Sequence, residues 1–234
     1  MHLRSMFDSV VESYDVINRL LTLGLDDFWR NICAKECATG KVIVDLCCGT
    51  AENTLHIQRR APPEASVLGV DFSKAMLMKA VEKRSQNEKV DYNKADMGFI
   101  LADSTFLPFR DGCIDRVGIS FSFRNLVYRN PRANISIQEV YRTLRKGGKF
   151  VCVETSQPSL RPISLFYHMY LRKILPLIGG LVSKRKLAYR YLAVSAINFP
   201  RAEEISDLLL RAGFRKVSFK HLTLGLVAIH ISVK

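Results

Sequence analysis

The sequence predicts an α/β fold in which a mostly parallel sheet of seven strands is covered by helices on both faces. Three observations support this prediction. Short β-branched runs alternate with helical stretches between residues 41 and 154, helical segments precede the first run, and two further apolar runs close the chain as a hairpin. Strands that alternate with helices pair in parallel, because each right-handed crossover returns the chain to the same end of the sheet.

The first part of the chain supplies the N-terminal helices and five of the strands. Residues 1–38 are an N-terminal helical segment, in which we expect two helices that are broken at Gly24. The five β-branched runs are residues 41–46, 66–71, 98–102, 115–121 and 149–154. Runs of this length are typical of buried strands. The helical stretches between them are residues 52–60, 73–85 and 131–144, with Ser73 as the expected N-cap of the second.

The alternation is interrupted after Glu154 by residues 157–192, which we interpret as a basic, mostly helical insertion or lid. It then resumes with a helix at 202–211, ended by Gly213, and with a hairpin formed by residues 214–219 and 224–232. No linker or repeat separates these parts. We therefore expect residues 1–234 to form a single domain.

Positive charge is concentrated in the second half of the chain. Residues 1–117 hold 15 basic and 17 acidic side chains, whereas residues 118–234 hold 20 basic and 5 acidic ones. Residues 157–192 contain seven bases, among them Lys184, Arg185 and Lys186, and no acid. This asymmetry favours an anionic partner, either nucleic acid or a lipid surface, although a solvated basic face would have the same composition.

Cysteine spacing and hydropathy indicate in which compartment the protein is located. The six cysteines form no C-x-x-C pair and have no histidine at zinc-ligand spacing, so we expect neither a metal site nor a disulfide framework. The N-terminus lacks an apolar stretch of the signal-peptide type, and the uncharged run at 174–183 is too short to span a bilayer. We expect a cytoplasmic protein that contacts a membrane peripherally.

Polar residues follow the first three strands in an order that predicts a cofactor site. The first strand ends in V-D-L-C-C-G-T-A-E, which contains Asp45, Gly49 and Thr50. The second ends in Asp71, and the third is followed by Asp103 and Ser104. Ligands of open α/β sheets bind outside these strand ends.

The predicted role of each residue follows from its chemistry. Gly49 lets the backbone approach a ligand, Asp71 accepts hydrogen bonds from ribose hydroxyls, and Asp103 with Ser104 reads an adenine amino group. Any one of the acids could instead shape a turn or cap a helix. Their order at successive strand ends predicts a nucleoside-like cofactor, and the absence of G-x-G-x-x-G disfavours a nicotinamide cofactor.

Several segments resemble the ubiquinone/menaquinone biosynthesis C-methyltransferases, the demethylmenaquinone methyltransferase-like family. The matching segments are M-F-D-S-V-V-E-S-Y-D-V-I-N-R-L-L-T-L-G at 6–24, L-P-F-R-D at 107–111, I-S-F-S-F-R-N at 119–125, L-R-K-G-G at 144–148, A-Y-R-Y-L at 188–192 and L-T-L-G-L-V-A-I-H at 222–230. They cover the chain nearly end to end. The resemblance implies a Rossmann-like class I methyltransferase fold, S-adenosylmethionine as cofactor and C-methylation of a polyprenylated quinol ring.

The resemblance also implies roles for individual residues. Cofactor contacts are carried over to Thr50, Asp71, Asp103, Ser104 and Ser120, and we add Asp45 and Gly49 from the strand-end pattern. The catalytic candidates are Arg124, Asn125 and Tyr14.

Arg124 and Asn125 follow the fourth strand, at the rim where the substrate should enter. Arg124 is expected to stabilise the anion that forms on the acceptor, unless it pairs with an acid and is structural. Tyr14 is expected to close over the substrate. Cys48 and Ala51 replace glycines that are usual in the family loop, but both are small, so we expect the turn to be kept.

Two further readings stay open. The basic half is compatible with methylation of RNA, and the fold is compatible with another small-molecule acceptor. The chain contains no recognisable RNA-binding module, so we expect no specific nucleic acid partner. A chain that lost catalysis with its glycines would be a lipid- or nucleotide-binding module. The sequence does not determine whether the substrate is a naphthoquinol or a benzoquinol, or how long its prenyl tail is. It also leaves open the general base and the oligomeric state, which includes a homodimer.

Overall fold

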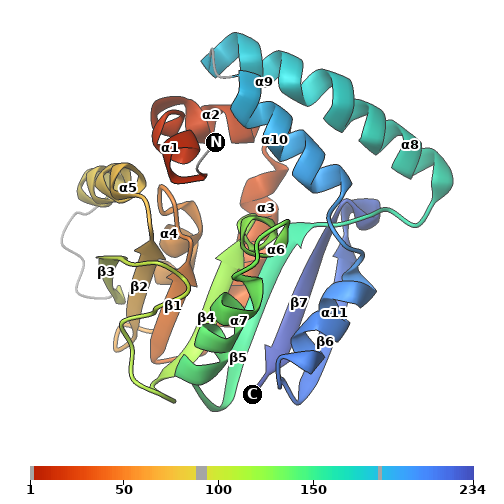
Figure 1. Ribbon diagram of the computed structural model, residues 1–234. Helices are drawn as coiled ribbons and strands as arrows, with labels where there is room; N and C mark the ends of the chain where they lie inside the picture. The colour runs from red at the N-terminus through yellow and green to blue at the C-terminus, as the bar shows by residue number, and fades with distance from the viewer. Residues whose placement is uncertain (1–2, 88–93, 184–185) are drawn as a thin grey trace.

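Seven strands form one sheet in the order β3-β2-β1-β4-β5-β7-β6 (Figure 1). The computed structural model describes residues 3–87, 94–183 and 186–234. The strands are β1 (Val42–Leu46), β2 (Ser66–Asp71), β3 (Asp96–Leu101), β4 (Ile114–Ser120), β5 (Leu144–Thr155), β6 (Lys216–Leu222) and β7 (Val227–Val233). The first five pair in parallel, whereas β7 is antiparallel to both β5 and β6. The predicted α/β fold is confirmed.

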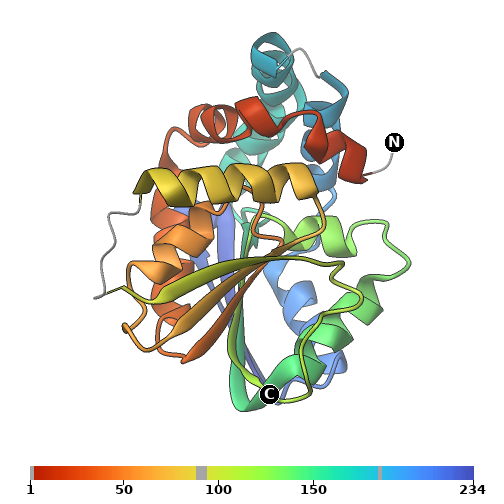
Figure 2. The same ribbon diagram turned by 90° about the vertical axis from the view of Figure 1, so that its left-hand side faces the viewer.

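Helices cover both faces of the sheet, which explains why the central strand β1 is buried along nearly its whole length. In β5, Phe150 faces α7 (Ala133–Thr143) and α11 (Ala202–Arg211), while Val151 and Val153 face the opposite side. That side is covered by α3 (Leu25–Cys37) and α4 (Glu52–Gln58). The helix α5 (Lys74–Asn87) runs beside β2 and β3 at one edge of the sheet (Figure 2).

A third layer of helices lies across the carboxyl ends of the parallel strands (Figures 1 and 2). This layer, called the cap below, consists of α1 (Leu3–Asp8), α2 (Val11–Leu21), α8 (Arg161–Met169), the π-helical turn η1 (Tyr170–Ile174), α9 (Leu175–Ser183) and α10 (Lys186–Ile197). Its two parts, far apart in the sequence, share one apolar core around Ile17, Leu171 and Tyr189. Gly179 permits this packing, because a Cβ there would collide with the Tyr189 ring.

Local details differ from the sequence prediction at a few places. The N-terminal segment forms three helices, since the chain breaks after Asp8 as well as at Gly24, where φ is 77°. The short helix α6 (Phe123–Val127) was not predicted, nor was the turn η2 (Thr223–Gly225). Ser73 does cap α5, because its Oγ accepts a hydrogen bond from the Met76 amide at 3.1 Å. The insertion is helical, as predicted, and continues to Ile197.

Among the described residues, no helix is both long and apolar enough to cross a membrane. Lys184 and Arg185, which belong to the basic cluster of the insertion, lie outside the described residues.

Candidate functional site

A cavity of about 1010 Å³ lies between the cap and the carboxyl ends of β1, β2, β3 and β4. Nearly all the predicted site residues line it. They are Tyr14, Gly49, Thr50, Asp71, Asp103, Ser104, Ser120 and Asn125. Asp45 and Arg124 are not among the lining residues. The structure thus brings together residues from six segments that are up to 111 positions apart, from Tyr14 to Asn125.

The loop after β1 keeps its turn although it contains few glycines. Cys47, Gly49 and Ala51 all have positive φ, at 54°, 55° and 70°. Positive φ costs a residue with a Cβ about 1–2 kcal/mol, so two of these positions are strained. The Cys48 amide donates to the Val70 carbonyl at 3.0 Å and anchors the loop to β2. A Cβ on Gly49 would meet no protein atom within 4 Å, so this glycine serves the backbone conformation and leaves open space.

Asp71 connects the ends of β1 and β2. Its Oδ2 accepts a hydrogen bond from the Gly49 amide at 2.9 Å, and its Oδ1 accepts one from the Ser73 amide at 2.8 Å. Burial raises the pKa of this carboxyl, although the hydrogen bonds from Ser73 and Gly49 oppose the rise. Each carboxylate oxygen has a second acceptor site. Asp71 can therefore hold the loop and a ligand hydroxyl at the same time.

The residues after β3 and β4 have different environments. Asp103 is exposed and pairs with Arg132 at 3.1 Å, while its other oxygen accepts the Thr105 amide at 2.9 Å. The Ser104 and Ser136 hydroxyls are 3.0 Å apart. The Ser120 Oγ is buried and has no hydrogen-bond partner in the described part of the chain. A buried polar atom in a cavity wall is a group that a ligand can satisfy.

Asp45 differs from its predicted role. It is 1% exposed, and its two oxygens accept hydrogen bonds from Asn53 Nδ2 at 2.7 Å and Thr54 Oγ1 at 2.6 Å. Both donors belong to α4, the helix that follows the loop. The carboxylate therefore fixes the start of α4 beneath the cavity and does not face a ligand, because its neighbours in the core enclose it.

This environment predicts a pH dependence of stability. Burial raises the pKa of Asp45 from 3.8 to about 6, although Thr54 and Asn53 lower it. An acid whose pKa is raised by folding favours the folded state while it is protonated, and this contribution is lost as the pH rises through the folded-state pKa. Relative to an Asp45→Asn variant, the parent protein should lose roughly 3 kcal/mol of unfolding free energy between about pH 4 and pH 7. Urea unfolding of both proteins over this range measures the difference; parallel stability curves would contradict the assignment.

The N-terminal helices form one wall of the cavity through contacts that were not predicted. The Thr50 hydroxyl donates to Asp15 Oδ1 at 2.6 Å, and Lys83 of α5 pairs with the other Asp15 oxygen at 2.6 Å. The Ser73 hydroxyl donates to Asp8. Asp8 ends α1 and Asp15 lies in α2, so the two acids come from different helices of the cap, and no local sequence pattern marks them as partners of the strand ends.

Arg124 lies in a buried ion pair behind the cavity wall. Its Nη1 is 3.0 Å from Glu154 Oε1, and its backbone amide donates to Glu154 Oε2 at 3.0 Å. Both side chains are almost fully buried. The prediction of a cation facing the substrate therefore does not match the structure, because the buried carboxylate of β5 attracts the guanidinium. Asn125, the next residue, does face the cavity, and its Oδ1 is 3.4 Å from the Tyr191 hydroxyl.

No group of metal-ligating side chains occurs in the described ranges, and the six cysteines are free. The thiols beside the cavity are poor nucleophiles, because burial raises the pKa of Cys47 and Cys48 well above the ordinary value. The cavity therefore offers carboxylates, hydroxyls and amides as its chemistry.

Comparison with known sequences identifies similar proteins. The chain matches the ubiE/COQ5 methyltransferase family over residues 1–234. It is 35% identical over 234 residues to the ubiquinone/menaquinone biosynthesis C-methyltransferase UbiE of Geotalea uraniireducens, with 99% of this chain and 96% of that protein covered. It is 33% identical over 231 residues to the demethylmenaquinone methyltransferase of Staphylococcus carnosus, with 98% and 91% covered.

Solved structures share the fold at low sequence identity. A SAM-dependent methyltransferase of Thermotoga maritima has a TM-score of 0.60 at 17% identity, with 99% of both chains covered. A SAM-dependent methyltransferase of Aquifex aeolicus has a TM-score of 0.63 at 14% identity, with 97% of both chains covered. At these identities the likeness concerns the fold alone.

Proposed function

The chain belongs to the ubiE/COQ5 methyltransferase family, and from this membership we propose that it transfers a methyl group from S-adenosylmethionine to a ring carbon of a polyprenylated quinol. The observation that carries the proposal is the cavity of about 1010 Å³ at the strand ends. It places a loop, a carboxylate and hydroxyls that suit a nucleoside next to a cap that suits an apolar acceptor. At about 1010 Å³ it has room for both molecules.

The lining residues fit S-adenosylmethionine by their donors and acceptors. The free acceptor sites of Asp71 suit the two ribose hydroxyls, and Asp103 with Ser104 suits the adenine. Ser120 offers a buried hydroxyl without a protein partner in the described residues. The backbone of Gly49 and Thr50 suits the remainder of the cofactor. When bound, S-adenosylmethionine supplies an activated methyl group.

The protein's part in the reaction is mainly to position the acceptor. A quinol ring carbon is a better nucleophile when a ring hydroxyl is ionised, so donors near that oxygen favour the reaction. Tyr14 and Asn125 line the cavity and can bind ring oxygens. Burial raises the pKa of Tyr14, which keeps its hydroxyl protonated and able to donate. The buried ion pair with Glu154 supports a positioning role for Arg124, which holds α6 and thereby Asn125.

A methyl-transfer assay tests this function. Purified protein, labelled S-adenosylmethionine and an extracted lipid quinol pool should yield a labelled lipid. Label on RNA and none on lipid would favour the RNA alternative. Cofactor binding by calorimetry without transfer to any acceptor would favour a binding module. Assays with naphthoquinols and benzoquinols of defined prenyl length then determine the substrate.

A polyprenylated acceptor resides in a bilayer, and we propose that the cap docks on anionic membranes from the cytoplasmic side. The outer face of α8, η1 and α9 exposes Leu165, Phe166 and Leu177 at 71%, 67% and 61%. Arg172 and Lys173 are exposed beside them, and residues 157–192 contain no acid. Apolar side chains flanked by bases are typical of helices that lie in a membrane interface.

Two loops extend this apolar surface beyond the insertion. Leu23 and Leu224 are 89% and 72% exposed, and both have positive φ. The Tyr170 hydroxyl donates to the Leu21 carbonyl and fixes the first loop to the cap, whereas Trp29 Nε1 donates to Thr223 Oγ1 at 2.8 Å and fixes the second loop to α3. Large leucines on strained, exposed loops support a surface that is covered by lipid.

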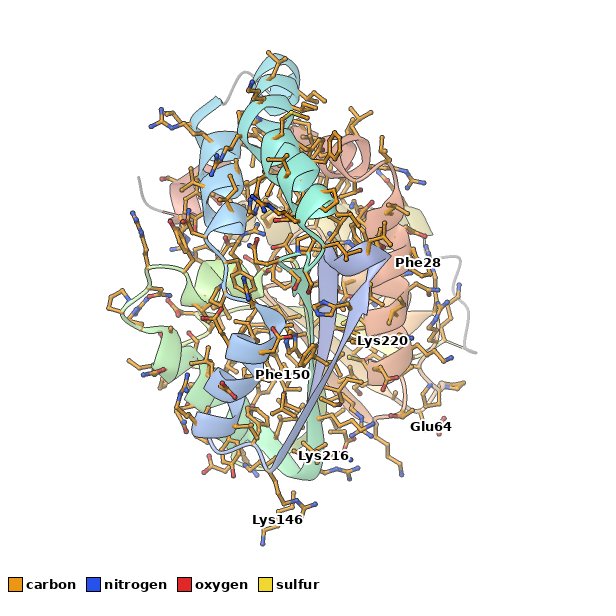
Figure 3. All side chains as sticks on the ribbon, turned by 90° about the vertical axis from the view of Figure 1, so that its right-hand side faces the viewer. Phe28, Glu64, Lys146, Phe150, Lys216 and Lys220 are labelled. Atoms are coloured by element: carbon orange, nitrogen blue, oxygen red, sulfur yellow. The ribbon has the colours of Figure 1, made fainter. Side chains whose placement is uncertain are left out.

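Membrane binding should depend on charge at the cap. Neutralising Arg172 and Lys173 together should weaken binding to anionic vesicles by about 2 kcal/mol, or roughly thirtyfold, since each base near an anionic leaflet contributes about 1 kcal/mol. Binding should also fall as salt rises. Lys146 and Lys216, exposed at the opposite end of the molecule, provide the matched control (Figure 3). Sedimentation with vesicles is the measurement, and equal pelleting with neutral and anionic vesicles would contradict the proposal.

A further inference from the structure

Arg30 of α3 is a buried cation in the cavity wall, and the roles assigned above do not use it. It is 8% exposed, and its Nε has no hydrogen-bond partner among the residues that the structure describes. Its ion-pair partner Asp26 lies 3.8 Å from Nε, which is beyond hydrogen-bonding distance. A buried charge is costly unless it is paired and hydrogen-bonded. Arg30 is therefore suited to bind an anionic or hydrogen-bond-accepting group of a ligand in the cavity.

The fold holds this guanidinium at the carboxyl end of β4. Its Cζ lies 5.3 Å from the ring centroid of Phe121, the residue that follows Ser120, and the Phe121 ring packs on Trp29 with centroids 5.6 Å apart. Phe121 has a φ of 57°, a left-handed conformation that costs about 1–2 kcal/mol. Strained residues of this kind persist where the surrounding structure fixes them, and they cluster at functional sites.

Charged and titratable groups from four elements act on Arg30. They are Asp26 on α3, Tyr14 on α2, Asp45 on β1 and His56 on α4. Asp45 is already engaged by two donors of α4. Burial raises the pKa of Tyr14 by more than the Arg30 charge lowers it, so the hydroxyl stays protonated. Arg30 and Tyr14 therefore present a cation and a neutral O–H donor to the same cavity.

Arg30 and Arg124 differ in what satisfies their charge. Arg124 is 3.0 Å from the buried Glu154 carboxylate and does not line the cavity. Arg30 lines the cavity, and its buried Nε has no hydrogen-bond partner among the described residues. An arginine stays protonated in proteins and offers five donors in a planar fork. Of the two, Arg30 is the one placed to meet an anion in the cavity.

We propose that Arg30 is the catalytic cation of this enzyme and binds the ring oxygen of the acceptor. This inference rests on the proposed function. When the O–H bond of the ring hydroxyl breaks, its proton passes to water and the electron pair stays on oxygen as an anion. The guanidinium donates hydrogen bonds to that oxyanion, and the buried surroundings strengthen the attraction. The ring carbon that accepts the methyl group thereby gains electron density at neutral pH.

The pH profile of Arg30→Gln is the decisive measurement. Loss of one stabiliser of an oxyanion should lower kcat at neutral pH by about a hundredfold. The variant's kcat should then rise with pH more steeply than that of the parent enzyme, because an opposite charge within a few ångströms lowers an acid's pKa by about 1–3 units and the variant lacks it. Arg30→Lys should recover part of the rate, since it keeps the charge and loses the fork. Lys35→Gln removes an exposed charge from the same helix and should leave kcat unchanged.

Thermal unfolding tests whether each variant is folded, and calorimetry with S-adenosylmethionine tests whether it binds the cofactor. An Arg30→Gln enzyme with the parent kcat and the parent pH profile would overturn the inference while the proposed function stands. If Arg30→Gln does not fold, Arg30→Lys decides, and a turnover equal to that of the parent would overturn it. A parent enzyme that transfers no methyl group to the quinol pool removes the proposed function and this role of Arg30 with it.

Discussion

Arg124→Ala should lower the free energy of unfolding by about 3–5 kcal/mol, because it leaves the Glu154 carboxylate buried and unpaired. The Nη1 hydrogen bond to Glu154 and its neighbour to the Thr155 hydroxyl, at 3.1 Å, are both lost. Glu154 also accepts the Arg124 amide at the start of α6, so the orientation of Asn125 should change with the pair. Urea unfolding measures the stability, and methyl transfer per folded molecule measures the activity.

A double variant separates the ion pair from a direct role in the reaction. Arg124→Met with Glu154→Gln removes both charges and keeps an acceptor for the α6 amide, so it should be more stable than Arg124→Ala. If Arg124 acts only by positioning Asn125, turnover per folded molecule should be higher in the double variant than in Arg124→Ala. If Arg124→Ala stays fully stable and loses turnover with the steep pH profile expected for Arg30→Gln, the anion-stabilising role returns to Arg124.

The sheet could be predicted because its signals are local. Each parallel strand is a short β-branched run, and the acids at the ends of β2 and β3 follow directly from the order of the strands. The break after Asp8 was harder to predict than the one at Gly24, since Ser9 and Val10 carry no strong turn signal. The short helix α6 owes its start to Glu154, a residue 30 positions away, which no local pattern reveals.

A residue's position in the sheet could be predicted from the sequence, whereas its hydrogen-bond and ion-pair partners could not. Asp71, Ser104 and Ser120 line the cavity because a strand end determines where they lie. The partners of Asp45 and Arg124 come from the packing of other elements against them, and both acquired structural hydrogen bonds. Arg30 lies within an ordinary amphipathic helix, and only its burial beside Phe121 distinguishes it from a solvated base.

Asp71→Ala should weaken binding of S-adenosylmethionine by about 1–3 kcal/mol, or roughly fivefold to 150-fold, because hydrogen bonds to a charged acceptor contribute about that much. The variant also frees the Gly49 and Ser73 amides, which Asp71 now accepts at 2.9 and 2.8 Å. The loop that follows β1 contains two strained residues, Cys47 and Ala51, and Asp71 is one of the groups that keep it in place. Part of the loss should therefore come from a less ordered loop.

Calorimetry of the cofactor with three proteins tests this assignment. Asp71→Asn keeps one acceptor oxygen but sets an NH2 group against one of the two amides, so its affinity should lie between those of the parent protein and Asp71→Ala. Asp96→Ala removes an exposed carboxylate from the far end of the neighbouring strand β3 and should bind like the parent. Unchanged affinity in Asp71→Ala would exclude the ribose role. An equal loss in Asp96→Ala would show that the field of the carboxylates, and not the hydrogen bonds of Asp71, attracts the cationic cofactor.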